Sequence, residues 1–372
     1  MRRFWFLVLL AAQKTPVYDF RPEDFGFVRA VEAVRPAVVS VEVLTPALVG
    51  SLFGQYERLL TQGGTSGFIV DPRGYVVTLY DQVKEAVSIH VTLTDGRRFP
   101  GKLVGADEFY NLAVIQILAE GTFPAVKFAD PKSLRIGEAV VSVGFPMGET
   151  LSVTYGVVSA KRDYWMFDYL VRDAIQTNAD FYRYNRGGPL VNMRGEVVGL
   201  SAYSSGDISL LLAVLPGSVL QDVQGLNFAI PADILQEVTQ KIINNEVIYH
   251  PWLGMILAPA DTTVRVYSNM PEDLVRKGVG LVVQFVDYQG PAAKQGFRLG
   301  DLIYGAEVWI ATEEGDIKLD ERFLTRPMDL IQLLLRTPAG GRIRFFYIRE
   351  GKAQQVDVYP FERPEDATPL TI

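Results

Sequence analysis

The sequence predicts a mainly β protein, and two observations carry that prediction. Short apolar runs recur between residues 37 and 230, separated by turn residues, in a chain that holds 33 glycines and 21 prolines. Residues 88–93 alternate apolar and polar side chains and lead into Asp95-Gly96, a hairpin signal. Regular short strands with little helix between them are typical of barrels or sandwiches.

The strands of this region follow one another at turn signals. Asp71-Pro72-Arg73-Gly74 forms a turn with Pro at its second position and Gly at its fourth. A break at residues 119–136 is the expected joint between two barrels of similar size. The expected strands lie at residues 66–70, 75–78, 88–93, 113–117, 139–143 and 196–200.

The remainder of the chain mixes helices and strands. Pro231 is expected to start a helix, because apolar residues from Ile234 to Ile243 recur at helical spacing. Strands are expected at 281–286 and 343–348, and helical stretches at 291–296 and 328–335. The predicted division is a signal-like or membrane-proximal segment (1–16), an aromatic and helical segment (17–35), a double β-barrel domain (36–245), a linker (246–251), an α/β domain (252–360) and a tail (361–372).

The first residues carry a possible targeting signal. Arg2 and Arg3 precede an apolar run over residues 4–12, as in a secretory signal. The run is too short to cross a bilayer as a helix, which takes roughly 20 residues. We therefore expect a place in the cell envelope or periplasm, or on the extracytoplasmic face of a membrane. The alternative is a misassigned start or a buried apolar segment, which would leave the protein in the cytoplasm.

Composition argues against several classes of function. The formal net charge of −7 and the lack of a long basic block disfavour a nucleic-acid binder. With no cysteine, the chain has no disulfide, thiolate metal site or cysteine nucleophile. No acidic cluster has convincing metal-ligand spacing, so we expect neither a metal nor a cofactor.

Three ordered segments resemble the protease domain of the HtrA/Deg family of trypsin-like serine proteases. Residues 67–78 are similar to the strand–turn–strand before that family's catalytic histidine, 105–114 to the stretch with its aspartate, and 175–192 to the stretch with its nucleophile. The resemblance implies two six-stranded, chymotrypsin-like β-barrels. In the C-terminal region, Gly290-Pro291-Ala292-Ala293 and Gly300-Asp301 resemble a PDZ domain of the same family.

Carried onto this sequence, the resemblance implies a degenerate triad. The histidine position is Asp81, the aspartate position Asn111 and the serine position Arg186, while Tyr184 stands where the oxyanion loop has a glycine. Acyl transfer needs a nucleophile, an imidazole base and a carboxylate that orients it, and arginine has no nucleophilic form. We therefore expect no catalytic residue and no enzymatic activity, and an Asp81–Arg186 ion pair beside Asn111. The alternative is that both side chains are solvated.

No other residue stands out as a replacement. The two histidines are His90, inside a strand, and His250, in the linker, where we expect an interdomain contact. Ser201, Ser204 and Ser205 follow the matched region without a recognisable base.

The PDZ resemblance implies a peptide groove. An extended peptide adds a strand to a sheet edge while loop amides hold its terminal carboxylate. The expected binding residues lie in one loop, one edge strand and one helix: Trp252, Leu253, Gly254, Met255, Ile256, Leu257, Met328, Ile331 and Leu335. The alternative for the apolar ones is core packing. Residues 306–327 are longer than in the family and are expected to alter or cover the groove.

The function expected from the sequence is a catalytically inactive, HtrA-like scaffold or subunit that binds peptide or protein C-termini. Two alternatives stay open: a noncatalytic chaperone-like holdase, and an active peptidase with displaced catalytic residues. As partners we expect a larger envelope or membrane-associated assembly, as a homotrimer or hetero-oligomer. The aromatics Tyr18, Phe20, Phe25 and Phe27 are expected either in a trimer contact or as staples on the first barrel.

Overall fold

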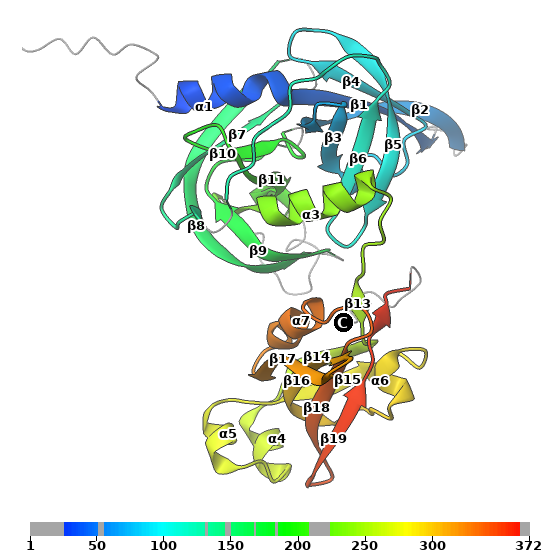
Figure 1. Ribbon diagram of the computed structural model, residues 1–372, viewed down its shortest axis with the longest axis vertical. Coiled ribbons are helices and arrows are strands. Elements are labelled where there is room, and N and C mark those ends of the chain that lie inside the picture. Colours follow the sequence, from blue (N-terminus) through cyan, green and yellow to red (C-terminus); the bar gives the residue numbers. More distant parts are fainter. Residues whose placement is uncertain are drawn as a thin grey trace, which may run out of the picture.

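The computed structural model describes residues 26–50, 56–130, 133–145, 150–166, 169–182, 185–207 and 224–364. The prediction of a mainly β fold is confirmed. Two closed barrels of six strands each are followed by a smaller α/β unit, and Figure 1 shows that unit below the barrels, joined to them by an extended linker.

The first barrel has the strand order β1-β2-β3-β6-β5-β4, all antiparallel neighbours. Strand β4 alternates half-buried and buried residues, which is the period-2 pattern of a strand with one face in a core. Its strands are β1 (Val38–Gly50), β2 (Tyr56–Asp71), β3 (Tyr75–Leu79), β4 (Ser88–Leu93), β5 (Arg98–Asp107) and β6 (Leu112–Ile117).

The second barrel repeats this topology in the order β10-β11-β12-β9-β8-β7. Strands β10, β11 and β12 are buried along their whole length, because they lie between the barrel interior and neighbouring elements. The predicted joint at 119–136 lies between β6 and β7. The strands are β7 (Ala139–Gly144), β8 (Ser152–Met166), β9 (Tyr169–Thr177), β10 (Pro189–Asn192), β11 (Val197–Tyr203) and β12 (Asn227–Pro231).

Helix α3 (Ala232–Ile243) begins where the sequence predicts, directly after Pro231. Asp233 in its first turn and Lys241 in its last turn complement the helix dipole. One face of α3 packs on β11 and β12 of the second barrel and on β5 and β6 of the first. Gly105 of β5 allows this approach, because a Cβ there would lie 2.9 Å from Ile242.

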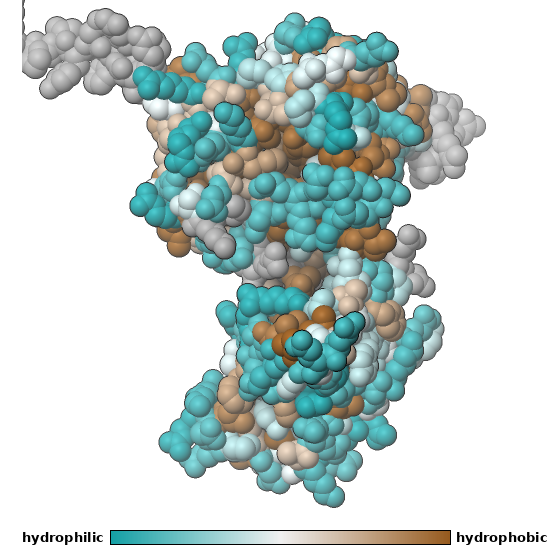
Figure 2. All heavy atoms as spheres, in the orientation of Figure 1, coloured by the Kyte–Doolittle hydropathy of each residue, from teal (hydrophilic) through white to brown (hydrophobic). Residues whose placement is uncertain are grey.

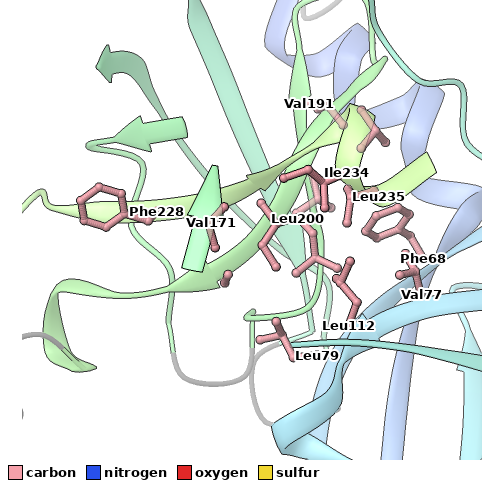
Figure 3. Packing of buried hydrophobic residues seen from close by; sticks show 14 of the residues in the cluster. Phe68, Val77, Leu79, Leu112, Val171, Val191, Leu200, Phe228, Ile234 and Leu235 are labelled. Carbon is pink, nitrogen blue, oxygen red and sulfur yellow. The ribbon is translucent and has the colours of Figure 1, made fainter. Parts of the chain in front are cut away.

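One hydrophobic core joins both barrels. Figure 3 shows Phe68, Leu79 and Leu112 of the first barrel beside Leu200 of the second, with Leu235 of α3 among them. The short helix α1 (Gly26–Val34) adds Ala30 and Val34 to this core before the turn of residues 35–37, which contains Pro36, ends it. The barrels therefore pack as one body, and loops at their junction are held from both sides.

The C-terminal unit is an antiparallel sheet with helices against it. Its order is β14-β15-β16-β18-β19, with β17 paired to β16, and a separate ribbon pairs β13 with β20. The elements are β13 (Pro251–Trp252), β14 (Met255–Pro259), α4 (Thr262–Tyr267), α5 (Glu272–Arg276), β15 (Leu281–Val286), α6 (Pro291–Lys294), β16 (Leu302–Thr312), β17 (Gly315–Phe323), α7 (Pro327–Leu335), β18 (Arg342–Arg349), β19 (Lys352–Val358) and β20 (Phe361–Glu362).

The stretch expected to be an insertion, 306–327, forms a long hairpin of β16 and β17. Arg322 of β17 donates a hydrogen bond to Gln332 of α7, and Asp320 pairs with Arg336 beyond that helix. The hairpin therefore packs against the helix that was expected to form one wall of the groove.

Most of the N-terminal segments and the end of the tail, with Tyr18, Phe20 and Phe25, lie outside the described residues. Phe27 packs against Tyr155 of β8, with ring centroids 5.1 Å apart. In the part of the chain that is described, no helix has the length and apolar character needed to span a membrane. Spheres coloured by hydropathy show mostly hydrophilic residues over α3 in this view (Figure 2).

Candidate functional site

A charged cluster lies where the two barrels meet, with Arg186 at its centre. Its Nη2 lies 3.2 Å from Asp81 Oδ2, and its Nη1 lies 3.3 Å from Asp207 Oδ1. Nε donates to the carbonyl oxygen of Ala202 at 2.6 Å. The Arg186 side chain is 10% exposed, against 24% and 28% for the two carboxylates. The guanidinium is thus mostly removed from water and bridges two acids.

Asp81 comes from a short turn that follows β3, and Asn111 holds its backbone. The Asn111 Oδ1 accepts a hydrogen bond from the Asp81 N–H at 2.8 Å. Asn111 has a φ of 55°, a left-handed conformation that asparagine tolerates better than most residues. Its Nδ2 and the Oδ1 of Asp81 are buried without a hydrogen-bond partner among the described residues. Asn111 therefore positions the turn that carries Asp81 and donates no hydrogen bond to the Asp81 carboxylate.

The loop that carries Arg186 is fixed by backbone contacts from both barrels. The Arg186 carbonyl accepts hydrogen bonds from Ser66 N–H at 3.0 Å and from Thr65 Oγ1 at 2.7 Å. The next N–H, of Gly187, donates to the Ser201 carbonyl at 2.7 Å. Gly187 has a φ of +84°, and a Cβ there would lie 2.3 Å from the Ser66 carbonyl oxygen. Only glycine fits at this position.

The predicted ion pair between Asp81 and Arg186 is confirmed. Asp207, which the sequence reasoning missed, is the second partner of the guanidinium. Asp207 also accepts from the Ser204 N–H at 2.8 Å and from its hydroxyl at 2.7 Å. Nothing in the sequence pointed to Asp207, because it meets Arg186 only through the turn after β11. Tyr184 lies outside the described residues.

The residues of the cluster limit which side chain could act as a nucleophile. Arginine stays protonated and offers no lone pair for attack on a carbonyl, so Arg186 is not a nucleophile. Ser204 has a carboxylate partner within the cluster, because its hydroxyl donates to Asp207 Oδ2. Ser201 is fully buried, and its hydroxyl lies 3.1 Å from that of Ser142.

The two histidines lie away from the cluster. His90 is on β4, with Nδ1 3.5 Å from the Ser88 hydroxyl. His250 makes the interdomain contact that was expected, with Nε2 2.7 Å from Asp107 Oδ2. Beside it, burial raises the pKa of Glu362 above its ordinary value of 4.5, against the smaller effect of the hydrogen bond from the His250 N–H.

The residues expected to bind peptide lie in one region of the C-terminal unit. Trp252 closes β13, and Met255, Ile256 and Leu257 belong to β14. Met255, Leu257 and Ile331 are buried, as the core-packing alternative expects, while Ile256, Met328 and Leu335 are half-buried.

The loop between β13 and β14 makes a close backbone approach. Gly254 has a φ of +77°, and a Cβ there would lie 2.8 Å from the Cα of Gly290. The carbonyl of Leu253 accepts from Ala292 N–H at 3.0 Å, and that of Gly254 from Asp287 N–H at 2.7 Å. Within the described chain, the N–H groups of Leu253 and Gly254 donate no backbone hydrogen bond.

A metal site is not evident in this geometry. Over the ranges that the structure describes, no three histidine or acidic side chains gather closely enough to hold a metal ion.

Comparison with known proteins gives three consistent matches. The trypsin-like peptidase domain family matches residues 65–200. A curated relative from Pseudomonas putida, a probable periplasmic serine endoprotease DegP-like, is 32% identical over 81% of this chain and 56% of its own length. One from Brucella melitensis with the same description is 29% identical over 95% of this chain and 72% of its own. The chain thus spans just over half the length of the first of these relatives.

Solved structures agree with the sequence matches. An HtrA-type protease, AlgWS227A, determined with a decapeptide, aligns with a TM-score of 0.73 and 26% identity over 92% of this chain and 98% of its own. AlgWS227A with a tripeptide aligns with a TM-score of 0.69 and 25% identity, over 91% and 97% of the two chains.

These relatives correct one expectation from the sequence. We expected the chain not to be an enzyme, because arginine and two other unsuited residues hold the matched triad positions. The relatives are named serine endoproteases, which contradicts that expectation. The inference failed because the loss of one set of groups does not exclude hydrolysis through another. The chain is a homologue of the HtrA/DegP-like, trypsin-like serine proteases.

Proposed function

We propose that the chain is a peptide-binding HtrA-like protein of the cell envelope, and that its C-terminal unit works as a PDZ domain. The observation that carries this proposal is the loop between β13 and β14. Gly254 is in a left-handed conformation and touches Gly290, next to the first strand of the sheet. Such a loop lets backbone N–H groups approach a terminal carboxylate while the peptide pairs with the adjacent strand.

The chemistry of the surroundings supports the same function. β14 pairs with β15 on one side, and half-buried Ile256, Met328 and Leu335 offer apolar contacts near its other side. Structures of the HtrA-type protease AlgW have been solved with a decapeptide and a tripeptide. The periplasmic description of the curated relatives supports a place in the envelope.

The test compares two forms of one peptide. Fluorescence anisotropy of the full chain is measured with a labelled decapeptide that ends in an apolar residue, as the free acid and as the C-terminal amide. The free acid is expected to bind at least about tenfold tighter, since a charge-assisted hydrogen bond to the carboxylate is lost in the amide. Equal affinity for both forms, or no binding of any peptide from a C-terminal library, would contradict the proposal.

A glycine substitution locates the site. Gly254→Ala places a Cβ against Gly290 in a left-handed backbone. We expect loss of peptide binding, because the loop must move away from its present path. Gly278→Ala is the matched control, since Gly278 has a φ of +70° and open space around it in the same unit.

A second function, peptide hydrolysis through a displaced serine, is favoured by the names of the relatives and by one contact. Ser204 Oγ donates to Asp207 Oδ2 at 2.7 Å, beside the Arg186 guanidinium. In this function Ser204 Oγ attacks the peptide carbonyl carbon and Asp207 takes its proton. The amine then leaves with that proton, and water releases the acyl group from Ser204.

Covalent labelling separates this function from binding alone. A fluorophosphonate probe, followed by mass spectrometry of the digested protein, is expected to modify Ser204. Ser204→Ala is expected to abolish both labelling and cleavage of unfolded casein, whereas Ser205→Ala retains them. Cleavage that persists in Ser204→Ala would assign hydrolysis to another residue and reject Ser204 as the nucleophile.

A further inference from the structure

The long β16–β17 hairpin holds helix α7 from one side. Arg322 of β17 donates a hydrogen bond to the Gln332 side chain in the middle of the helix. Asp320 Oδ2 lies 3.0 Å from Nη1 of Arg336, at the end of the helix, and 3.6 Å from Nη2 of Arg322. Both β17 side chains are half-buried, so water screens these contacts less than those of a fully exposed pair. One strand thus contacts the helix at two points about one turn apart.

The first turn of α7 is held by the residues that directly follow β17. Asp329 Oδ2 accepts hydrogen bonds from the Thr325 N–H at 2.9 Å and from its hydroxyl at 2.7 Å. The same oxygen accepts from the Arg326 N–H at 2.9 Å. Because residues 324–326 continue the path of β17, the position of the first turn depends on where the hairpin lies. The hairpin and its exit therefore contact α7 at its start, its middle and its end.

The hairpin is itself fixed to the sheet through its other face. Arg342 of β18 pairs with Asp316 of β17 at 2.7 Å, and its guanidinium lies 5.6 Å from the ring centroid of Trp309 on β16. Successive residues of a strand point to opposite faces, and Ile343, the next residue, is buried in the same core as Leu330 of α7. Arg342 therefore anchors the hairpin from the face that α7 does not cover.

A further side of α7 belongs to the core that the helix shares with β14. Leu330, Leu333 and Leu334 pack in one cluster with Met255 and Leu257 of that strand. Helix α7 contacts β14 as well as both strands of the hairpin (Figure 1). The hairpin and the strand expected to pair with a peptide therefore meet the same helix, and a shift of that helix changes its distance from β14.

We infer that the β16–β17 hairpin sets the selectivity of the peptide groove by fixing α7, with Arg322 and Asp320 as positioning residues. The inference rests on the proposed peptide-binding function. A helix that cannot shift admits only those terminal side chains that fit the space beside β14, whereas a helix that can shift adapts to several. A fixed helix also removes the cost of ordering the site on binding, so the best peptide binds more tightly. The stretch 306–327 thus alters the groove through α7.

Peptide affinities of the full chain test this inference. Fluorescence anisotropy is measured with labelled decapeptides that differ only in the last residue, which is alanine, valine, leucine or phenylalanine. The wild type is expected to separate the best from the worst by at least about twentyfold, and Arg322→Ala to narrow this ratio to below about fivefold. Arg322→Lys, which keeps a donor for Gln332, is expected to restore most of the ratio. Arg276→Ala is the matched control, since Arg276 forms an exposed pair with Glu272 on α5 of the same unit.

Hydrogen–deuterium exchange of the same variants shows whether the helix is the element that loosens. In Arg322→Ala the amides of α7 are expected to exchange at least about tenfold faster, the effect of one lost hydrogen bond to a charged group, while β18 and β19 stay unchanged. A uniform increase over the whole unit would report general destabilisation and overturn the inference. So would a ratio of affinities that persists in Arg322→Ala, which leaves the proposed function intact. A wild type that binds none of the peptides would reject that function and the inference together.

Discussion

Arg186 and Asp81 form an ion pair of 3.2 Å that joins the second barrel to the first. The pair is set by backbone contacts on both sides: the Ser66 N–H holds the Arg186 carbonyl, and Asn111 holds the Asp81 N–H. Asp207 adds a second acid to the same guanidinium. This arrangement ties together the turn that carries Asp81, the loop that carries Arg186 and the turn after β11. Arg186 therefore contributes to the stability of the junction between the barrels.

Removal of the guanidinium should destabilise the barrels. In Arg186→Ala, two partly buried carboxylates lose their common partner and face each other. We expect a loss of about 2 to 3 kcal/mol in the free energy of unfolding. Urea denaturation followed by circular dichroism measures it. Arg135→Ala is the control, because Arg135 is 86% exposed in its pair with Glu138 and should change stability little. Equal effects in the two variants would refute the structural role of Arg186.

The fit of Gly187 between the barrels gives a second prediction. Gly187→Ala places a Cβ 2.3 Å from the Ser66 carbonyl oxygen, and Gly96→Ala meets open space at a similar positive φ. Both changes strain the backbone, by about 1 kcal/mol, but only the first also forces the loop away from Ser66. Thermal melting should therefore show a much larger loss for Gly187→Ala. Similar melting temperatures for the two variants would mean that the loop moves aside at little cost.

The two barrels and several strand positions were predictable because period-2 patterns and turn residues act locally. Residues 88–93 alternate along their length and form β4 as predicted. The pair of Asp81 and Arg186 was predictable only because the ordered motifs resemble a family in which those positions meet. Asp207 was not, since its contact with Arg186 depends on how the chain turns after β11.

The path of the hairpin in the C-terminal unit was not predictable from the sequence. Residues 306–327 were identified as longer than in the family, but the contact of Arg322 with Gln332 of α7 depends on the direction in which the hairpin leaves the sheet. The pairing of β16 with β17 shifts its register between Val308 and Trp309, as at a β-bulge. Bulges turn the strand locally, and no pattern in these residues indicated one in advance.

Asp329 in the first turn of α7 predicts a pH dependence for the C-terminal unit. Burial raises the pKa of this carboxyl, but hydrogen bonds from the Thr325 side chain and from the Thr325 and Arg326 N–H groups outweigh burial and hold the pKa below its ordinary value of 3.8. A lowered folded-state pKa stabilises the protein above the unfolded value, and that stability is lost as pH falls through the folded value.

The measurement compares Asp329→Asn with the wild type across pH. At pH 7 the variant is expected to lose about 1 kcal/mol, because its amide oxygen can accept the same hydrogen bonds but without the charge that strengthens them. The difference should begin to shrink as pH falls below about 4, where the carboxyl becomes protonated in the unfolded state, and should disappear once pH falls below the lowered folded-state pKa. Denaturation monitored at Trp252 and Trp309 reports on this unit. A difference that stays constant down to pH 2 would show that the Asp329 charge does not matter.

An exposed apolar row on β8 predicts self-association. Val153, Tyr155 and Val157 alternate along the strand and are 42%, 72% and 39% exposed, and Phe27 packs beside Tyr155. Large apolar side chains gathered on one face are typical of protein contacts, and burial of three of them contributes about 1.5 to 3 kcal/mol each. We expect a trimer by light scattering after gel filtration, and a monomer for Tyr155→Asp.

Tyr267→Asp is the control, since Tyr267 on α4 is 83% exposed in the other unit and should leave the assembly intact. A wild-type monomer, or a trimer unchanged in Tyr155→Asp, would assign this row to packing within the chain, where Phe27 already covers part of it.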